Sequence, residues 1–185
     1  MSSVKLDLQG LKRLEVGVAE LQKNTEPFFN SSVKELAARL LSKVKKRTPV
    51  GVPPTDISDE VFKSYWAGYV GGTLRRGWTA KTEAEAMQGS GEGTDVITFL
   101  HGVAVLKDSK GYHITLINPV KYADYVEFGH RQEPGRFVPA IGKRLKKGFV
   151  PGQYMLTISE KELAQQAPAI LQRKLEKFLQ EAFHD

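Results

Sequence analysis

The clearest element of this sequence is the stretch TEPFFNSSVKELAARLLSKVKKR, residues 25–47. Its apolar side chains recur every three or four positions, the spacing that places them on one face of an α-helix. Thr25 can cap such a helix and Pro27 suits its first turn, while Pro49 disfavours helix at Thr48. The sequence therefore predicts a helix that ends just before Thr48 and packs one stripe into a core. The stripe consists of Phe29, Val33, Leu36, Ala37, Leu40, Leu41 and Val44.

A further helix is expected on each side of this element. Residues 8–22 carry Leu11, Leu14, Val18 and Leu21 at helical spacing, although Gly17 weakens that helix. Near the C-terminus, Ser159 and Glu162 have the spacing of a capping box, which predicts that the last helix begins there. Pro168 removes an amide donor from its middle, so we expect a kink or a break.

The middle of the chain is predicted to form a small antiparallel sheet after a long irregular segment. Residues 96–106 and 112–117 are rich in β-branched and aromatic side chains, and the turn-forming sequence DSKG joins them as a hairpin. Glycine and proline punctuate residues 51–93, which predicts a loop-rich insertion. Within it we expect a short strand over 74–79 and either a surface helical turn or a mobile tip over 81–88.

Two shorter pieces complete the expected fold. Residues 122–128 suit a short helix or an extended segment, and residues 143–147 suit a turn of helix. The predicted class is α+β, with a small antiparallel sheet packed with two N-terminal helices and a C-terminal helix. The length of 185 residues favours a single domain over 1–185, with 51–93 as its insertion.

Composition excludes several classes of protein. The chain has no cysteine, which removes disulfide scaffolds, thiolate zinc sites and cysteine nucleophiles. It has no apolar run of the length that crosses a membrane and no signal-peptide pattern, so no membrane partner is expected. The formal charge of +6 is concentrated in two basic stretches, residues 34–47 and 143–147. Such patches attract phosphates or acidic proteins.

The residue types that carry catalysis are sparse. The chain has four histidines, of which His101 and His113 fall in the expected hairpin strands. His130 follows Glu127 by three positions, but Gly129 lies between them and no second acid stands nearby. The glycine-containing segments at 71–72 and 148–152 lack the lysine and hydroxyl spacing of a nucleotide-binding loop. We therefore expect no catalytic residues, no metal and no cofactor.

Three pieces of sequence occur in a recognisable order: RTPV at 47–50, LRRGW at 74–78 and INPVKYADYVEFGHR at 117–131. In this order they resemble the phage minor tail-component family, whose members act as neck or tail-completion proteins. The resemblance looks closest to the branch found in PBSX-type defective phages, in which an element like FVPGQYML at 149–156 and a C-terminal helix follow. It spans roughly residues 36–183.

This resemblance implies a structural protein that joins head and tail in the neck of a virion and is made in the cytoplasm of a bacterial host. The implied partners are the head connector or portal-adaptor proteins, tail terminator or tail tube proteins, and double-stranded DNA passing through the channel. Further copies of the chain would form a ring. A hexameric ring would match a sixfold tail tube, and a dodecamer would match the connector. The resemblance implies no enzymatic activity.

The chain departs from the family pattern between the first two pieces, where residues 51–73 intervene. The aromatic residues of that segment suit ordering by a neighbouring subunit. The candidate interface residues are Phe62, Tyr65, Trp66, Tyr69, Tyr122, Tyr125, Glu127, His130, Arg131, Arg39, Lys43, Lys46 and Lys147. The basic ones are expected to meet protein more than DNA, because tight phosphate binding would retard DNA passage. The alternative function is a basic nucleic-acid-binding module.

Overall fold

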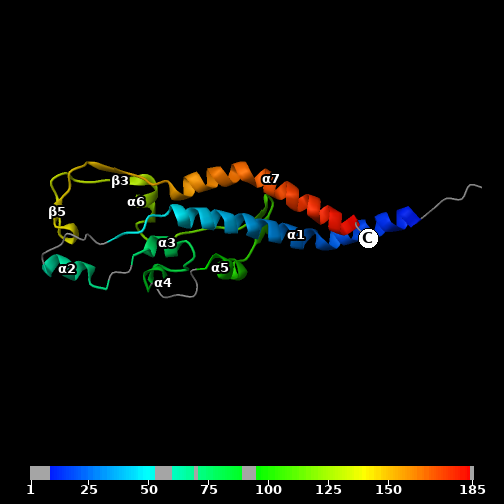
Figure 1. Ribbon diagram of the computed structural model, residues 1–185, viewed down its shortest axis with the longest axis horizontal. Helices are drawn as coiled ribbons and strands as arrows, with labels where there is room; N and C mark the ends of the chain where they lie inside the picture. The colour runs from blue at the N-terminus through cyan, green and yellow to red at the C-terminus, as the bar shows by residue number, and fades with distance from the viewer. Residues whose placement is uncertain (1–8, 53–59, 69–70, 89–94, 184–185) are drawn as a thin grey trace, which may run out of the picture.

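Two long helices lying side by side form the frame of this computed structural model, which describes residues 9–52, 60–68, 71–88 and 95–183 (Figure 1). The first is α1, Gln9–Arg47, and the second is α7, Met155–Phe183. Arg47 contacts Ser159 at one end, and Phe28 stacks on Phe178 farther along. The two helices are therefore antiparallel, because the contact with the lower residue number on α1 has the higher residue number on α7.

The two predicted N-terminal helices are in fact one continuous helix, so that expectation was wrong. Pro27 lies inside α1, and the Thr25 hydroxyl donates to the Leu21 carbonyl at 2.6 Å instead of capping a new helix. The continuity follows from tertiary packing: α7 covers α1 on both sides of the expected break, at Gly17 and at Phe28. Packing of this kind outweighs local start and stop signals.

The predicted capping box of the C-terminal helix was also wrong. α7 begins at Met155, so Ser159 lies inside the helix, where its hydroxyl donates to the Met155 carbonyl at 2.6 Å. Glu162 forms ion pairs with α1 instead of closing a cap. The helix continues through Pro168 without a break, and Figure 1 shows it changing direction near its middle.

The segment predicted to be loop-rich contains short helices. These are α2 Glu60–Trp66, α3 Thr73–Gly77 and α4 Glu83–Gln88, followed by α5 Val96–Gly102. The helical turn expected over 81–88 is confirmed as α4. The strand expected over 74–79 is helix α3, and the first part of the expected strand 96–106 is helix α5. The Asp95 carboxylate caps α5 by accepting from the amides of Ile97 and Thr98, a signal that β-branched composition concealed.

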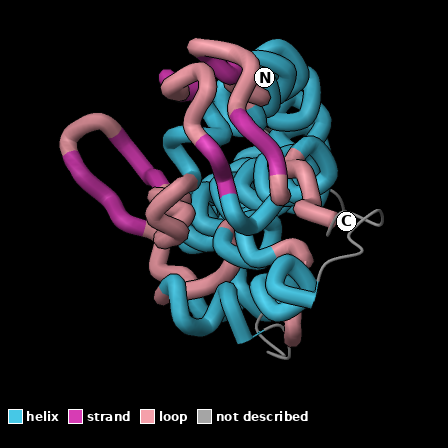
Figure 2. Tube along the Cα trace, turned by 90° about the vertical axis from the view of Figure 1, so that its left-hand side faces the viewer, coloured by secondary structure: helices cyan, strands magenta, loops and turns pink. Residues whose placement is uncertain are grey.

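The strands are short and pair within antiparallel ribbons. The expected hairpin is confirmed at its turn, where β1 Leu106–Asp108 pairs with β2 Gly111–His113. After α6 Ala123–Phe128, β3 Gly129–Arg131 pairs with β6 Phe149–Pro151, and β4 Phe137–Val138 pairs with β5 Lys143–Arg144. The short 3₁₀ helix η2 Pro139–Ile141 separates β4 from β5. The helical turn expected over 143–147 is therefore wrong. Figure 2 shows that the strands stay in separate pairs, and the α+β class is confirmed in this form.

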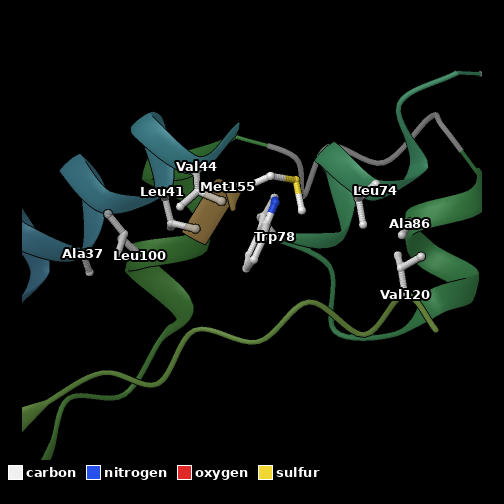
Figure 3. Close-up of a cluster of buried hydrophobic side chains, with 9 residues drawn as sticks. All are labelled: Ala37, Leu41, Val44, Leu74, Trp78, Ala86, Leu100, Val120 and Met155. Carbon is white, nitrogen blue, oxygen red and sulfur yellow. The ribbon is translucent and has the colours of Figure 1, made fainter. Parts of the chain in front are cut away.

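The core lies where α1 ends and α7 begins, and Figure 3 shows its buried side chains. The predicted stripe of α1 supplies Ala37, Leu41 and Val44, and the segment predicted to be loop-rich supplies Leu74, Trp78 and Ala86. Leu100, Val120 and Met155 complete the cluster. Because the smaller elements pack around this end, the opposite halves of α1 and α7 carry exposed apolar side chains.

Candidate functional site

Three sequence pieces that are far apart in the chain meet at the C-terminal end of α1. The Arg75 guanidinium donates to the Thr48 carbonyl at 2.8 and 3.2 Å, and the Trp78 indole donates to the Thr48 hydroxyl at 2.8 Å. The buried Thr48 hydroxyl in turn donates to the Val44 carbonyl at 2.7 Å. The Asn118 amide donates to the Leu74 carbonyl at 2.9 Å. These pieces therefore form a structural junction, in which the side chains of Thr48, Arg75, Trp78 and Asn118 are paired within the chain.

The Tyr122 to Arg131 segment holds the start of α7 through the buried carboxylate of Glu127. The Leu156 amide donates to one oxygen at 3.0 Å, and the amide and hydroxyl of Thr157 donate to the other at 3.0 and 2.8 Å. A carboxylate at a helix N-terminus satisfies free amides and complements the helix dipole. Gly129 and Gly152 permit this approach, because a Cβ at either position would collide with the facing backbone. The Glu127 carboxylate therefore makes its contacts within the chain.

The aromatic candidates near Glu127 are exposed. Tyr125 keeps 59% of its surface exposed and Tyr122 keeps 41%, and the neighbouring Phe128, which was not a candidate, keeps 59%. The Tyr125 ring lies edge-on to His130, with ring centroids 5.8 Å apart. Arg131 is exposed and His130 is half-buried. The motif segment thus combines a buried anchor with a surface of aromatic side chains.

The aromatic candidates of residues 51–73 are only partly described. The Trp66 indole donates to the Ala140 carbonyl at 2.7 Å, which ties α2 to η2. Phe62 and Tyr65 belong to α2, but their side chains fall outside the described set, and Tyr69 lies outside the described residues.

Three of the six basic side chains in the first basic stretch pair with carboxylates of the same chain. Arg39 pairs with Glu35 at 2.8 Å, while Lys43 and Arg47 pair with Glu162 at 3.0 and 2.7 Å. The hydrogen bond from Arg39 lowers the pKa of Glu35, and Lys174 adds to this effect. The hydrogen bond from Lys43 lowers the pKa of Glu162. The stretch therefore stabilises the contact between α1 and α7 more than it forms a free patch.

Two lysines of the same stretch differ in environment. Burial lowers the pKa of Lys45, an effect that the charge of Asp95 partly opposes, and the Lys45 ammonium lies 3.5 Å from the Thr79 hydroxyl. Lys46, the next residue along the helix, is exposed. In the second basic stretch, Lys147 is also exposed.

An exposed apolar surface covers the end of the long helices away from the core. We call it the distal face, and it consists of Leu11, Leu14 and Val18 on α1 and Leu175, Leu179 and Phe183 on α7, each 39% to 58% exposed. The sequence predicted the α1 stripe, but it did not show that the stripe stays uncovered. For the part of the distal face on α7, the sequence signal was the helical spacing of Leu175, Leu179 and Phe183.

Both halves of the distal face lie on the same side of the helix pair. Gly17 lies in the seam, since a Cβ there would collide with the Phe183 ring, and Phe178 lies in the seam against Phe28. Val18 and Leu179 each follow a seam residue by one position, a rotation of about 100°. In two antiparallel helices, side chains that follow a seam residue by the same number of positions point to the same side of the pair. The two stripes therefore join into one apolar surface.

Among the described residues, no group of three or more His, Asp and Glu side chains is gathered as a metal ion would require. An open groove of about 690 Å³ between α1 and α7 is lined by Glu35, Arg39 and other polar side chains. In the described part of the chain, no helix has an apolar stretch that could cross a bilayer.

Comparison with known families identifies the class of protein as a phage tail component. Residues 12–129 match the family described as "Bacteriophage HK97-gp10, putative tail-component", which is 118 of the 185 residues. The chain belongs to this HK97-gp10-like family. No curated protein and no solved structure matches it. The match contains the first two pieces of the junction and the third piece as far as Gly129, where β3 begins, so the rest of β3, the later strands and α7 lie beyond it.

Proposed function

We propose that this chain is a structural protein of the phage neck, where it joins the head connector to the tail by forming a ring around the DNA channel. The distal face carries this proposal: a member of a tail-component family presents an apolar surface that no described part of its own chain covers. In this role the protein acts by assembly, without catalysis, and is incorporated into virions made in the host cytoplasm. The FVPGQYML element at 149–156 supports placement in the PBSX-type branch.

The size of the distal face suits contact between subunits. Six apolar side chains with about half of their surface exposed present roughly 500 Å² of apolar area, within the range of functional patches on monomers. A standard interface buries about 800 Å² on each partner, so this face supplies more than half of one side. The rest of that side of the interface is then a polar rim around the distal face.

The occupant of the distal face is a second copy of the chain. Residues 9–16 of α1 extend past Gly17, where the last residue of α7 makes its contact (Figure 1). An isolated helical segment of this length is marginal in water, so the extension needs a neighbour. Placing the extension of one copy beside the α7 stripe of the next gives a head-to-tail contact, which closes into a ring when the rotation is right. A hexamer is the preferred ring, and a dodecamer is the alternative.

The subunit contact is tested with Leu179→Glu and the control Gln180→Glu, which places the same charge on an exposed neighbouring position. Light scattering after size-exclusion chromatography should show rings for the wild type and the control, and monomers for Leu179→Glu with unchanged helicity. A monomeric wild type at high concentration, or rings in all three proteins, would contradict the proposed contact.

The neck role itself is tested in the phage. Deletion of the gene should leave heads and tails that do not join, or tails of unstable length. Normal infectious particles after a clean deletion would rule the role out.

A basic nucleic-acid-binding module remains the second candidate, and the charge of residues 129–152 favours it. The two functions differ in assembly. A module of this kind would bind DNA as a monomer and leave head–tail joining intact when deleted.

A further inference from the structure

The segment from Gly129 to Gly152, which we call the basic arm, carries almost all of the net charge of the chain. It contains Arg131, Arg136, Lys143, Arg144, Lys146 and Lys147 against the single acid Glu133, a net charge of +5 out of +6 for the protein. All six basic residues are exposed. The remaining 161 residues are nearly neutral, and Arg39, Lys43 and Arg47 of α1 pair with carboxylates.

The basic arm is one long antiparallel ribbon. The pairing of β3 with β6 continues through the Gln132 amide to the Gly148 carbonyl at 2.9 Å and the Gly135 amide to the Leu145 carbonyl at 2.8 Å. It then reaches the pairing of β4 with β5, so the two short sheets belong to a single hairpin with η2 at its tip. Ten residues of extended chain span about 33 Å. Figure 1 shows this ribbon at the end of the molecule opposite the C-terminus.

Contacts within the protein hold the ribbon in place. The Trp66 indole donates to the Ala140 carbonyl beside the tip, and the Arg144 guanidinium donates to the Gly135 carbonyl at 2.7 Å across the ribbon. At its base, Gly129 and Gly152 pack against the corner that caps α7. The cations are therefore displayed on a positioned element.

The chemistry of the arm favours a phosphate backbone over a protein surface. Protein interfaces mix both signs of charge and are depleted of lysine, whereas the arm has six cations and one acid, and three of the cations are lysines. Phosphates accept from lysine and arginine alike, without regard to base sequence. A two-stranded ribbon also has the width that a major groove admits.

We propose that the basic arm is the element through which this protein contacts the backbone of double-stranded DNA. The proposal rests on the proposed neck function, in which DNA passes through the ring, and it assigns the contact to residues 129–152. It revises the expectation that Lys147 meets mainly protein, while Arg39 and Lys43 keep their contacts within the chain. Binding through a few exposed cations is salt-sensitive, which is compatible with DNA that must move.

The test is fluorescence anisotropy of the purified full chain with a short duplex of arbitrary sequence across a salt series. If about five phosphates are neutralised, affinity should fall on the order of 500-fold between 50 and 200 mM salt. For Lys146→Gln with Lys147→Gln, about three phosphates remain and the fall should be about 40-fold. The control is Lys23→Gln with Lys161→Gln, which removes the same charge from exposed positions of α1 and α7 and should behave as wild type.

The outcomes separate this proposal from the ring. Absence of duplex binding by the wild type, or equal loss in the arm variant and the control, would overturn the DNA contact and indicate an acidic protein partner or a general charge effect. Light scattering of the same samples measures assembly. Rings without DNA binding would leave the neck function standing, and DNA binding without rings would count against the neck function alone.

Discussion

Removing the carboxylate of Glu127 should destabilise the whole protein, because one side chain secures the start of α7. In Glu127→Ala the amides of Leu156 and Thr157 and the Thr157 hydroxyl lose their acceptor. An ordinary N-cap contributes about 1 kcal/mol, and a hydrogen bond to a charged group contributes about 1.5 to 3 kcal/mol, with losses in one cluster not fully additive. Favourable interaction of a partly buried charge with the helix dipole adds up to about 2 kcal/mol.

Taken together, these contributions predict a loss of about 3 kcal/mol in the free energy of unfolding, after allowing for partial solvation of the freed amides. For a chain of this length that corresponds to a decrease in Tm of about 6 to 12 °C. Urea unfolding and thermal melts followed by circular dichroism measure both quantities. Amide hydrogen exchange should also accelerate at Leu156 and Thr157.

Two variants make the test specific. Glu127→Gln keeps one acceptor oxygen without the charge and should fall between wild type and Glu127→Ala. Glu160→Ala removes an exposed carboxylate from the same end of α7 and should stay within about 0.5 kcal/mol of wild type. If Glu127→Ala is no less stable than Glu160→Ala, the capping role assigned to Glu127 is incorrect.

Three further predictions follow from other contacts. Gly152→Ala should lower stability by more than about 2 kcal/mol, measured by urea unfolding, because its Cβ would collide with the backbone of α6. Trp78→Phe should cost about 1 to 2 kcal/mol in the same assay, because the buried Thr48 hydroxyl loses its donor. The stability advantage of wild type over Glu162→Gln should depend on pH. Since Lys43 lowers the folded-state pKa of Glu162, the advantage is present above the unfolded pKa of about 4.3 and disappears as pH falls through the folded value. Thermal melts at neutral and acidic pH check this, and a constant advantage would contradict it.

Local sequence patterns predicted those parts of the fold whose interactions are close in the chain. The stripe of residues 25–47 correctly placed Ala37, Leu41 and Val44 in the core, because helical period alone decides which face they share. The turn at Asp108 to Gly111 was predicted for the same reason, since its chemistry lies within four residues. The junction pieces could be recognised in sequence, but the hydrogen bonds that join Thr48 to Arg75 could not.

Sequence alone misassigned elements that depend on distant partners. The strand expected over 74–79 is wrong because Leu74 and Gly77 are buried in a short helix against Asn118 and Val120. Ser159 and Glu162 have the spacing of a capping box. Their side chains instead accept hydrogen bonds from α1 residues that lie 112 to 119 positions away in the sequence. In both cases the tertiary contacts outweigh the local sequence preference, because they provide buried or charged partners that a local cap cannot provide.

By itself the sequence determined the net charge, the apolar stripe of α1 and the motif order that marks a phage tail component. It could not distinguish its two basic stretches, since both appear as clusters of lysine and arginine. Only the tertiary structure decided that Lys43 and Arg47 face Glu162, whereas the six cations of the basic arm are exposed. The physical reason is that a charge acts according to what lies within a few ångströms, and the packing of α7 on α1 sets those distances.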